Sequence, residues 1–248
     1  MNKRIPLLLL TCVVSATSLA QTVDDIIARS VAARGGMDKL KAVQSQRLTG
    51  HISFGSEAEG ALTVEMKRPG KVREELTVND QSLIRTSDGK SGWVVNPFSG
   101  KADAEPLGAE EMGNMVQKAD IDRPIVDYKA KGNQVELVGK EKVEGKDAYK
   151  LKVTLKDGQV RFDYLDCDSY LEVKWEGKLT VQGKEFDAVS YFRDYKPVEG
   201  VTYPFLIDSA SGDTKQQIVF DKVEINPAID DARFGKPSPP PAQSPKAP

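Results

Sequence analysis

The side chains able to do bond-making chemistry are few and scattered. The chain of 248 residues holds a single histidine, His51, on the polar side of a stretch in which apolar and polar residues alternate. A lone histidine of this kind has no nucleophile beside it to activate, so an incidental role is expected. Gly-x-Ser-x-Gly, phosphate-loop and His-Glu-x-x-His signatures are missing from the sequence. The sequence therefore predicts a protein that is not an enzyme and needs no cofactor, and a hydrolase is the least favoured class.

Cys167 is the other reactive side chain, and it stands between two carboxylates in Asp166-Cys167-Asp168. Neighbouring negative charge raises the pKa of a thiol, which disfavours a nucleophilic role. Asp163, Asp166 and Asp168 could be combined into a calcium site, but the spacing lacks the Gly and the terminal Glu of a calcium loop. An ordinary acidic turn is expected, and no metal site is predicted.

Glu74 has two interpretations. On the expected strand 71–78 it shares a face with Val72, Leu76 and Val78. A carboxylate on a dry face needs a partner. Glu74 therefore either forms an ion pair with a nearby Arg or Lys at a sheet edge, or is a polar group at the mouth of a cavity.

Composition and charge describe a globular protein with no affinity for nucleic acid. Lys and Arg number 35 against 37 Asp and Glu, so the net charge is −2, and 39% of the residues are hydrophobic. This balance provides no basic surface for a phosphate backbone.

Residues 1–20 have the pattern of an export signal: basic Lys3-Arg4, an apolar run over 5–14 and a small-x-small site that ends at Ala20. Cleavage after Ala20 removes Cys12, so the mature chain has no internal disulfide. Cys12 is alternatively a lipid-attachment cysteine, but Thr11 stands where such sites prefer a small residue. Secretion without an anchor is therefore the preferred reading.

Helices and strands are expected to alternate in a defined order. Thr22 to Asp25 resembles a capping box that opens a helix ended by Gly35-Gly36, and a second short helix is expected over 37–43. Residues 107–120 form an amphipathic helix with apolar residues at i, i+3, i+4 and i+7. Between these helices lie about ten or eleven strand-like runs of period two, separated by hairpin turns. The turn signals are Pro69-Gly70, Asn79-Asp80, Asp88-Gly89, Asp157-Gly158, Gly183-Lys184 and Ser211-Gly212-Asp213.

A sheet of this size with one dry face needs more cover than two or three short helices give. It must curl, and the helices must close its open side. The expected fold class is α+β: an incomplete antiparallel β-barrel of about 10–11 strands whose helical lid encloses a hydrophobic cavity. The expected divisions are a signal peptide (1–20), one domain (21–236) and a disordered Pro-rich tail (237–248). Met66, Met112 and Met115 either fill the core or line the cavity, because flexible thioethers fit irregular apolar chains.

Three segments in order resemble the LolA family of periplasmic lipoprotein carriers. Residues 60–69 end in Lys67-Arg68-Pro69, residues 87–90 read Ser-Asp-Gly-Lys, and Trp93 precedes Asn96-Pro97-Phe98. The export signal, the helices and residues 229–234 agree more weakly, and the extra C-terminal strand and helix of the family are not evident.

The resemblance implies binding of acyl chains of lipoproteins, or of a related lipid, in the hydrophobic cavity of a monomeric periplasmic chaperone. It implies an inner-membrane releasing complex and an outer-membrane receptor as partners. It also gives Arg68 the role of a latch that bonds the lid helices and holds the empty cavity shut. The alternative for Arg68 is a strand-end pair with a carboxylate such as Glu74.

The leading hypothesis is a carrier that sorts outer-membrane lipoproteins. The residues expected to line its cavity are Leu62, Val64, Met66, Trp93, Val95, Phe98, Met112, Met115, Val116, Ile27 and Val31. The alternative is a lipid-sensing envelope-stress or scaffold domain of the same fold, whose tail reaches a partner.

Overall fold

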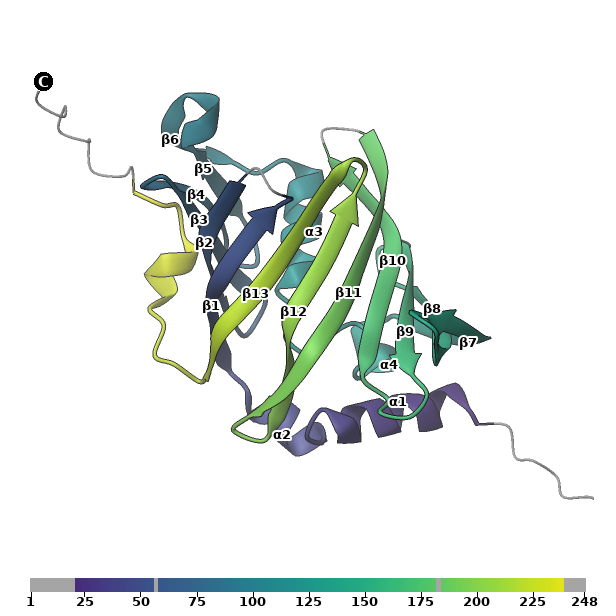
Figure 1. Cartoon of the computed structure of the whole chain (residues 1–248). Coiled ribbons are helices and arrows are strands. Elements are labelled where there is room, and N and C mark those ends of the chain that lie inside the picture. Colours follow the sequence, from purple (N-terminus) through teal and green to yellow (C-terminus); the bar gives the residue numbers. More distant parts are fainter. Residues whose placement is uncertain (1–20, 56–57, 182–183, 239–248) are drawn as a thin grey trace, which may run out of the picture.

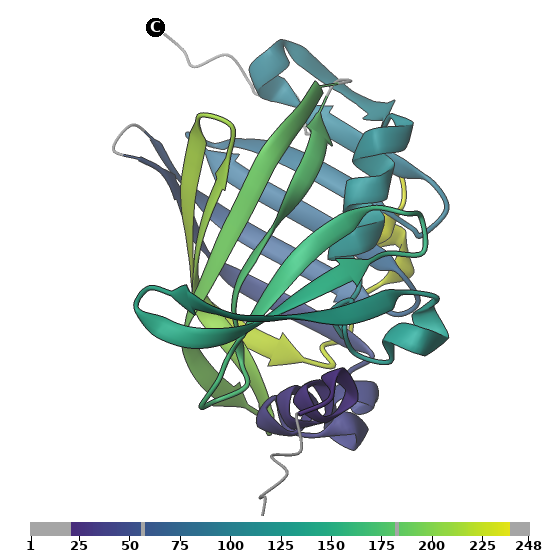
Figure 2. The same cartoon turned by 90° about the vertical axis from the view of Figure 1, so that its right-hand side faces the viewer.

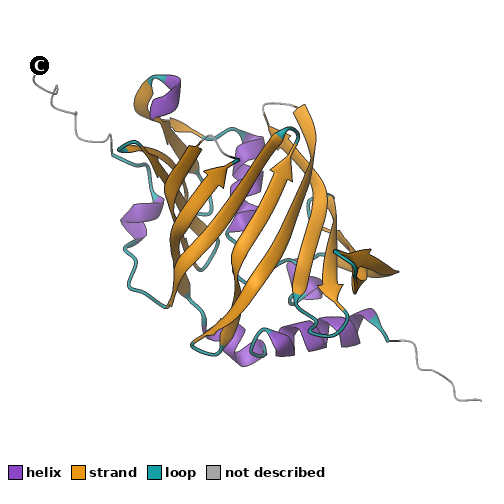
Figure 3. Ribbon diagram, in the orientation of Figure 1, coloured by secondary structure: helices purple, strands orange, loops and turns teal. Residues whose placement is uncertain are grey.

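One antiparallel sheet of thirteen strands makes up most of the computed structural model, which describes residues 21–55, 58–181 and 184–238 (Figures 1 and 3). The strands are β1 (Ser45–Phe54), β2 (Ala58–Lys67), β3 (Lys71–Val78), β4 (Gln81–Ser87), β5 (Gly92–Asn96), β6 (Lys101–Pro106), β7 (Gln134–Val143), β8 (Lys146–Thr154), β9 (Val160–Asp166), β10 (Glu172–Val181), β11 (Lys184–Val198), β12 (Val201–Ser211) and β13 (Thr214–Ile225). The helices are α1 (Val23–Ala33), α2 (Met37–Ala42), α3 (Ala109–Lys118) and α4 (Tyr128–Lys131), with 3-10 turns η1 (Pro97–Ser99) and η2 (Asp231–Phe234). The signal, with Cys12, and residues 239–248 of the tail lie outside the described residues.

The strand order joins two meanders. β1 to β6 follow one another in one half, β7 to β13 in the other, and β1 pairs with β13 where the halves meet. β6 and β7 are the two edges, so the barrel is not closed. The incomplete barrel is confirmed, but the thirteen strands exceed the expected ten or eleven. β6 carries no apolar alternation (Lys-Ala-Asp-Ala-Glu-Pro), and such a strand leaves no period-two signal.

The turns follow the local sequence chemistry. Asn79 and Asp80 both have positive φ, 49° and 63°, as a two-residue hairpin turn that matches strand twist requires. The Glu144-Gly145 and Glu199-Gly200 turns, which the sequence reading missed, have the same left-handed pair of residues. Hairpin turns at these positions account for the meander order of both halves.

The helices cover the open parts of the barrel. The capping box of α1 is present, with Asp25 N donating to Thr22 Oγ1 at 3.2 Å, and α1 and α2 lie across one end of the barrel (Figure 1). α3 belongs to the segment that connects the two edge strands, and it packs against β3 and β4 on one side and β10 on the other (Figure 2). The expected helix over 107–120 is thereby confirmed, as the piece that crosses the opening.

The inner face of the sheet and the helices share one continuous apolar core. α1 and α2 contribute Ile26, Ile27, Val31 and Leu40, and the segment between α3 and α4 contributes Ile121, Ile125 and Val126. The strands contribute Leu48, Ile52, Leu62, Val64, Val135, Tyr149, Leu151, Val153, Leu165, Val201, Tyr203, Phe205, Phe220 and Val223. The core therefore lies between the sheet and its lid.

The outer face is covered in one place by the C-terminal segment. η2 lies against the outside of β3 and β4, with Phe234 fully buried (Figure 1). Glu65, 1% exposed, accepts from Arg47 Nε at 2.8 Å and from Arg233 Nε at 2.6 Å. Two arginines thus compensate this buried carboxylate and fix the C-terminal segment to β1 and β2.

Within the described ranges, the chain has no helix of the length and apolar character that crossing a membrane requires.

Candidate functional site

Arg68 joins the sheet to its lid. It follows β2, and its Nη1 and Nη2 donate to the two carboxylate oxygens of Asp122 at 2.8 and 2.6 Å. Its Nε donates to the Val43 carbonyl at 2.7 Å and its Nη2 to the Leu40 carbonyl at 3.3 Å, at the C-terminal end of α2. One guanidinium therefore bonds both α2 and the segment after α3.

Asp122 is the lid residue that receives this guanidinium. Its side chain is 2% exposed, and Lys41 of α2 lies 3.9 Å away. Burial alone would raise the pKa of Asp122, but the hydrogen bonds and charge of Arg68 outweigh burial and hold it below its usual value. The same bonds raise the pKa of Arg68. The pair is therefore ionised at neutral pH.

Arg123, next in the chain, connects the lid to the other half of the sheet. Its Nε lies 3.8 Å from Glu172 of β10, and its guanidinium stacks over the Phe192 ring of β11 at 4.8 Å. Arg123 has φ of 75°, a left-handed conformation that costs a non-glycine residue about 1–3 kcal/mol. We name the segment 119–127 the clasp, because Asp122 and Arg123 tie it to opposite halves of the open sheet.

Most of the residues expected to line the cavity meet at the lid. Ile27 and Val31 of α1 are buried in one cluster with Leu62 and Val64 of β2. Met115 of α3 packs with Val72 and Ala119, and Met66 touches both clusters. Met112 Sδ would lie 2.8 Å from a Cβ at Gly92, so this glycine allows α3 to approach β5 closely.

Trp93 and Val95 are not brought into this group. Trp93 pairs with Thr86 and Val95 with Ile84, whereas the inner residue of β5 is Val94, opposite Arg85 and in register with Glu74 and Val64. Both side chains therefore lie on the outer face, contrary to the expectation. Three consecutive apolar residues carry no parity signal, and only the strand register decides which of them points inward.

Phe98 and Val116 also stand apart from the buried group. Phe98, in η1, is 51% exposed, and Val116, on α3, is 50% exposed. Each follows an apolar pattern in the sequence, but neither side chain is covered in the structure.

Glu74 pairs with the lid and not with Arg68. Lys118 Nζ of α3 donates to its two carboxylate oxygens at 2.8 and 3.1 Å. Burial alone would raise the pKa of Glu74, but the Lys118 charge and hydrogen bonds lower it below its usual value. Of the two interpretations, the ion pair is the one observed, and it fastens α3 to β3.

A buried charged group inside the barrel was missed by the sequence reading. Arg161 of β9 donates to Asp163 at 2.5 Å and to Glu172 at 3.1 Å, and it stacks on the Trp175 ring at 4.7 Å. Asp163 is 1% exposed, and burial raises its pKa to about 6 although Arg161 opposes the shift. On β9 the charged residues point inward, while Phe162 and Tyr164 lie on the outer face with Val143 and Ala148.

The acidic turn after β9 is an ordinary turn. Asp166 Oδ1 accepts from the backbone N–H groups of Asp168 and Ser169, at 3.2 and 2.8 Å, while Asp163 points into the barrel. These carboxylates do not converge. No group of three metal-ligating side chains occurs in the part of the chain that the structure describes.

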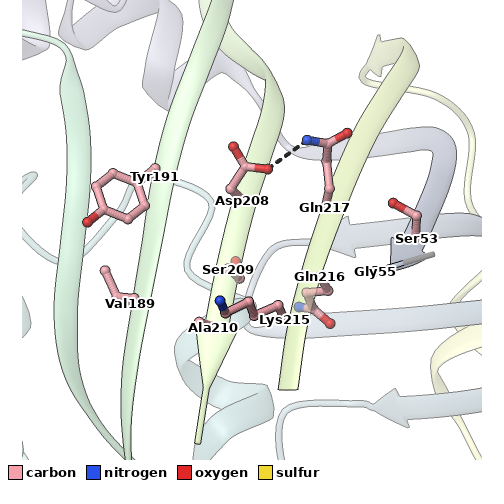
Figure 4. Close-up of a pocket in the computed structure, with 10 residues that line it drawn as sticks. All are labelled: Ser53, Gly55, Val189, Tyr191, Asp208, Ser209, Ala210, Lys215, Gln216 and Gln217. Atoms are coloured by element: carbon pink, nitrogen blue, oxygen red, sulfur yellow. Dashed lines mark hydrogen bonds between the residues drawn. The ribbon is translucent and has the colours of Figure 1, made fainter. Parts of the chain in front are cut away.

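Two depressions on the molecule lie away from the expected cavity. One is formed mainly by polar outer-face residues of β11, β12 and β13, where Gln217 Nε2 donates to Asp208 at 2.8 Å (Figure 4). The other lies beside the β7–β8 turn, with Glu144, Lys146 and Arg193 among its lining residues. Neither contains a residue expected to hold an acyl chain.

We compared the sequence and the structure with those of known proteins. No family model and no curated protein matches the sequence. Among solved structures, a LolA superfamily protein from Nitrosomonas europaea aligns over 88% of this chain and 99% of its own, with a TM-score of 0.58 and 15% identity. The chain has a LolA-like fold.

Two further structures share this LolA-like fold. A DUF1329 family protein from Desulfovibrio piger covers 87% of this chain and 98% of its own, with a TM-score of 0.58 and 13% identity. A domain from Vibrio parahaemolyticus, named for outer membrane lipoprotein sorting, covers 85% and 94%, with a TM-score of 0.56 and 11% identity. In all three the likeness extends over nearly the whole neighbour and over 85–88% of this chain.

Proposed function

We propose that the protein is a periplasmic carrier that binds the acyl chains of lipoproteins, or of related lipids, between the inner face of the sheet and the lid. The observation that carries the proposal is the apolar core shared by α1, the clasp and the strands, in a barrel left open between β6 and β7. Each buried CH₂ of a ligand contributes about 0.8 kcal/mol, so an acyl chain can replace the lid against these strands.

Entry requires the lid to move, because the inner residues are buried against it. The contacts that must open include three ion pairs, Arg68 to Asp122, Arg123 to Glu172 and Lys118 to Glu74, together with the apolar contacts of the lid helices. This combination of ion pairs at the lid and apolar contacts beneath it is suited to a lid that is closed without ligand and opens when an apolar chain binds. The proposed lining is Ile27, Val31, Leu62, Val64, Met66, Met112 and Met115.

Lipid analysis of the protein purified from an envelope fraction tests this function. The extract should contain acyl lipid in near-stoichiometric amount, and delipidated protein should take up a fluorescent fatty acid. A protein that carries no lipid and takes up no probe is not a carrier.

A further inference from the structure

Arg34 is a cation inside the lid without a counter-ion. It is the C-cap of α1, and its Nη1 donates to the backbone carbonyl of Asp122 at 2.8 Å. Among the described residues, no carboxylate lies within ion-pair distance of its guanidinium. Burial, and secondarily the charge of Arg123, lower the pKa of Arg34 below its usual value. A guanidinium with five N–H donors here makes one hydrogen bond, to a neutral oxygen.

Arg123 is a second cation, near enough to Arg34 for its charge to lower the pKa of Arg34. Its guanidinium donates no hydrogen bond to any described residue, its one acidic neighbour, Glu172, is 3.8 Å away, and a third of the side chain remains exposed. Arg68, by contrast, makes four hydrogen bonds, and Arg161 makes one to each of two carboxylates. The free N–H groups of Arg34 and Arg123 thus contrast with the guanidinium groups of Arg68 and Arg161, which are bonded to carboxylates.

The charges around the two arginines leave an excess of positive charge. Arg34, Arg123 and Arg161 face two carboxylates, Asp163 and Glu172, and Arg161 already bonds both of these. Partial protonation of Asp163 near neutral pH would enlarge the excess, since burial raises its pKa to about 6. A single anion would neutralise the group.

We propose that Arg34 and Arg123 bind the anionic headgroup of the acyl lipid, with a phosphate as the group that two guanidinium forks fit best. The inference rests on the proposed function and names the class of its ligand. Arg123 belongs to the clasp, and Arg34 bonds the Asp122 carbonyl of the same segment, which also carries the buried Ile121, Ile125 and Val126. A lipid with its chain on the inner face of the strands would place its headgroup at this edge of the core.

Two probes with the same chain separate the headgroup from the acyl site. The full mature chain is titrated with 1-oleoyl-glycerol, which is neutral, and with its 3-phosphate. The wild type should bind the phosphate form about tenfold more tightly or better, a factor typical of charge-assisted hydrogen bonds. Arg34→Gln and Arg123→Gln should each remove most of this preference, measured as the ratio of the two affinities. Arg34→Gln should leave the affinity for the neutral probe unchanged, whereas Arg123→Gln also loses the lid contact to Glu172, so for this variant only the ratio is interpreted. Arg34→Lys should keep part of the preference, and Arg29→Gln, on the exposed side of α1, should keep all of it.

The outcomes distinguish this inference from the function on which it rests. If both probes bind and the phosphate preference is absent or survives in both Gln variants, the anion site is overturned and the carrier function stands. If neither lipid binds but inorganic phosphate shifts the arginine side-chain NMR signals of the wild type and not of the variants, the site takes free phosphate and the lipid proposal is overturned. A preference that both Gln variants lose, with folding unchanged by circular dichroism, supports the inference.

Discussion

At the scale of single residues, the Arg68–Asp122 pair is the buried ion pair that joins the sheet to its lid. Asp122 is almost completely buried, and its charge is compensated by one guanidinium at close range and one lysine at 3.9 Å. Removing one partner of a buried pair leaves the other charge without compensation, which costs about 3–5 kcal/mol. Because Arg68 also bonds the end of α2, its loss releases two lid elements together.

Arg68→Leu should therefore favour the open state. Acyl-probe binding is expected to be as tight as in the wild type or several-fold tighter, and release to be several-fold slower, because the closed empty state no longer competes with the ligand. Stopped-flow displacement of a fluorescent fatty acid measures the rate. Arg68→Lys, which keeps the charge, is the control, and an unchanged release rate in the Leu variant contradicts the latch.

The pH dependence of stability should report the same pair. The pKa of Asp122 is lower in the folded protein than in the unfolded chain, so its contribution is complete above the unfolded value of about 3.9 and is lost as the pH falls through the folded pKa. Asp122→Asn should destabilise the protein by about 3–5 kcal/mol at pH 7 and have a smaller effect near pH 2. Urea unfolding at the two pH values measures this, and an equal difference at both would refute the assignment.

At the scale of elements, the sequence predicted what local rules determine. The Thr22–Asp25 capping box, the Gly35-Gly36 stop and the periodic Met residues of α3 each depend on neighbours within a few positions, and all three elements form where expected. The faces of β5 and β9 depend on pairing with distant strands. Trp93-Val94-Val95 is apolar throughout, and Arg161 and Asp163 alternate with aromatic residues that point outward. Burial of those charges depends on tertiary contacts, and the apolar/polar alternation of β9 predicts the opposite assignment of its two faces.

The assignment of residues to the inner and outer faces of the sheet can be tested with one substitution on each face. Val64→Ala and Val95→Ala each remove the same two methyl groups from a buried site, and each should cost about 1–3 kcal/mol of unfolding free energy. Only Val64→Ala should also weaken acyl-probe binding, because Val64 lies on the inner face. Equal effects on binding would contradict the assignment of the two faces.

At the scale of the whole molecule, the segment that connects the two edge strands is also the lid. Residues 107–133 run from β6 to β7, so the chain must cross the opening of the barrel wherever that segment folds. The sequence predicted this closure, because two or three short helices are too few to cover the apolar face of a flat sheet of this size. The ion pairs that hold the closure join residues more than forty positions apart, so no local pattern reveals them.

Removal of residues 237–248 discriminates the carrier from the sensor hypothesis. A carrier should keep its acyl-probe affinity without the tail, because Phe234 and η2 remain to cover β3 and β4. The unfolding free energy should fall only slightly, through loss of the buried Pro237. Binding assays and urea unfolding of the shortened chain check this. Preserved lipid binding together with loss of an envelope partner would instead favour the sensor.

The two tryptophans permit a direct test of where the ligand lies. Trp175 is on the inner face, opposite Asp163 and Ser190, and Trp93 is on the outer face, opposite Thr86. The titration uses a brominated fatty acid, which quenches indole fluorescence at short range. In Trp93→Phe only Trp175 emits, and its fluorescence should be quenched. In Trp175→Phe only Trp93 emits, and its fluorescence should stay unchanged. Quenching of Trp93 alone, or of neither tryptophan at saturating ligand, would contradict an acyl site inside the barrel.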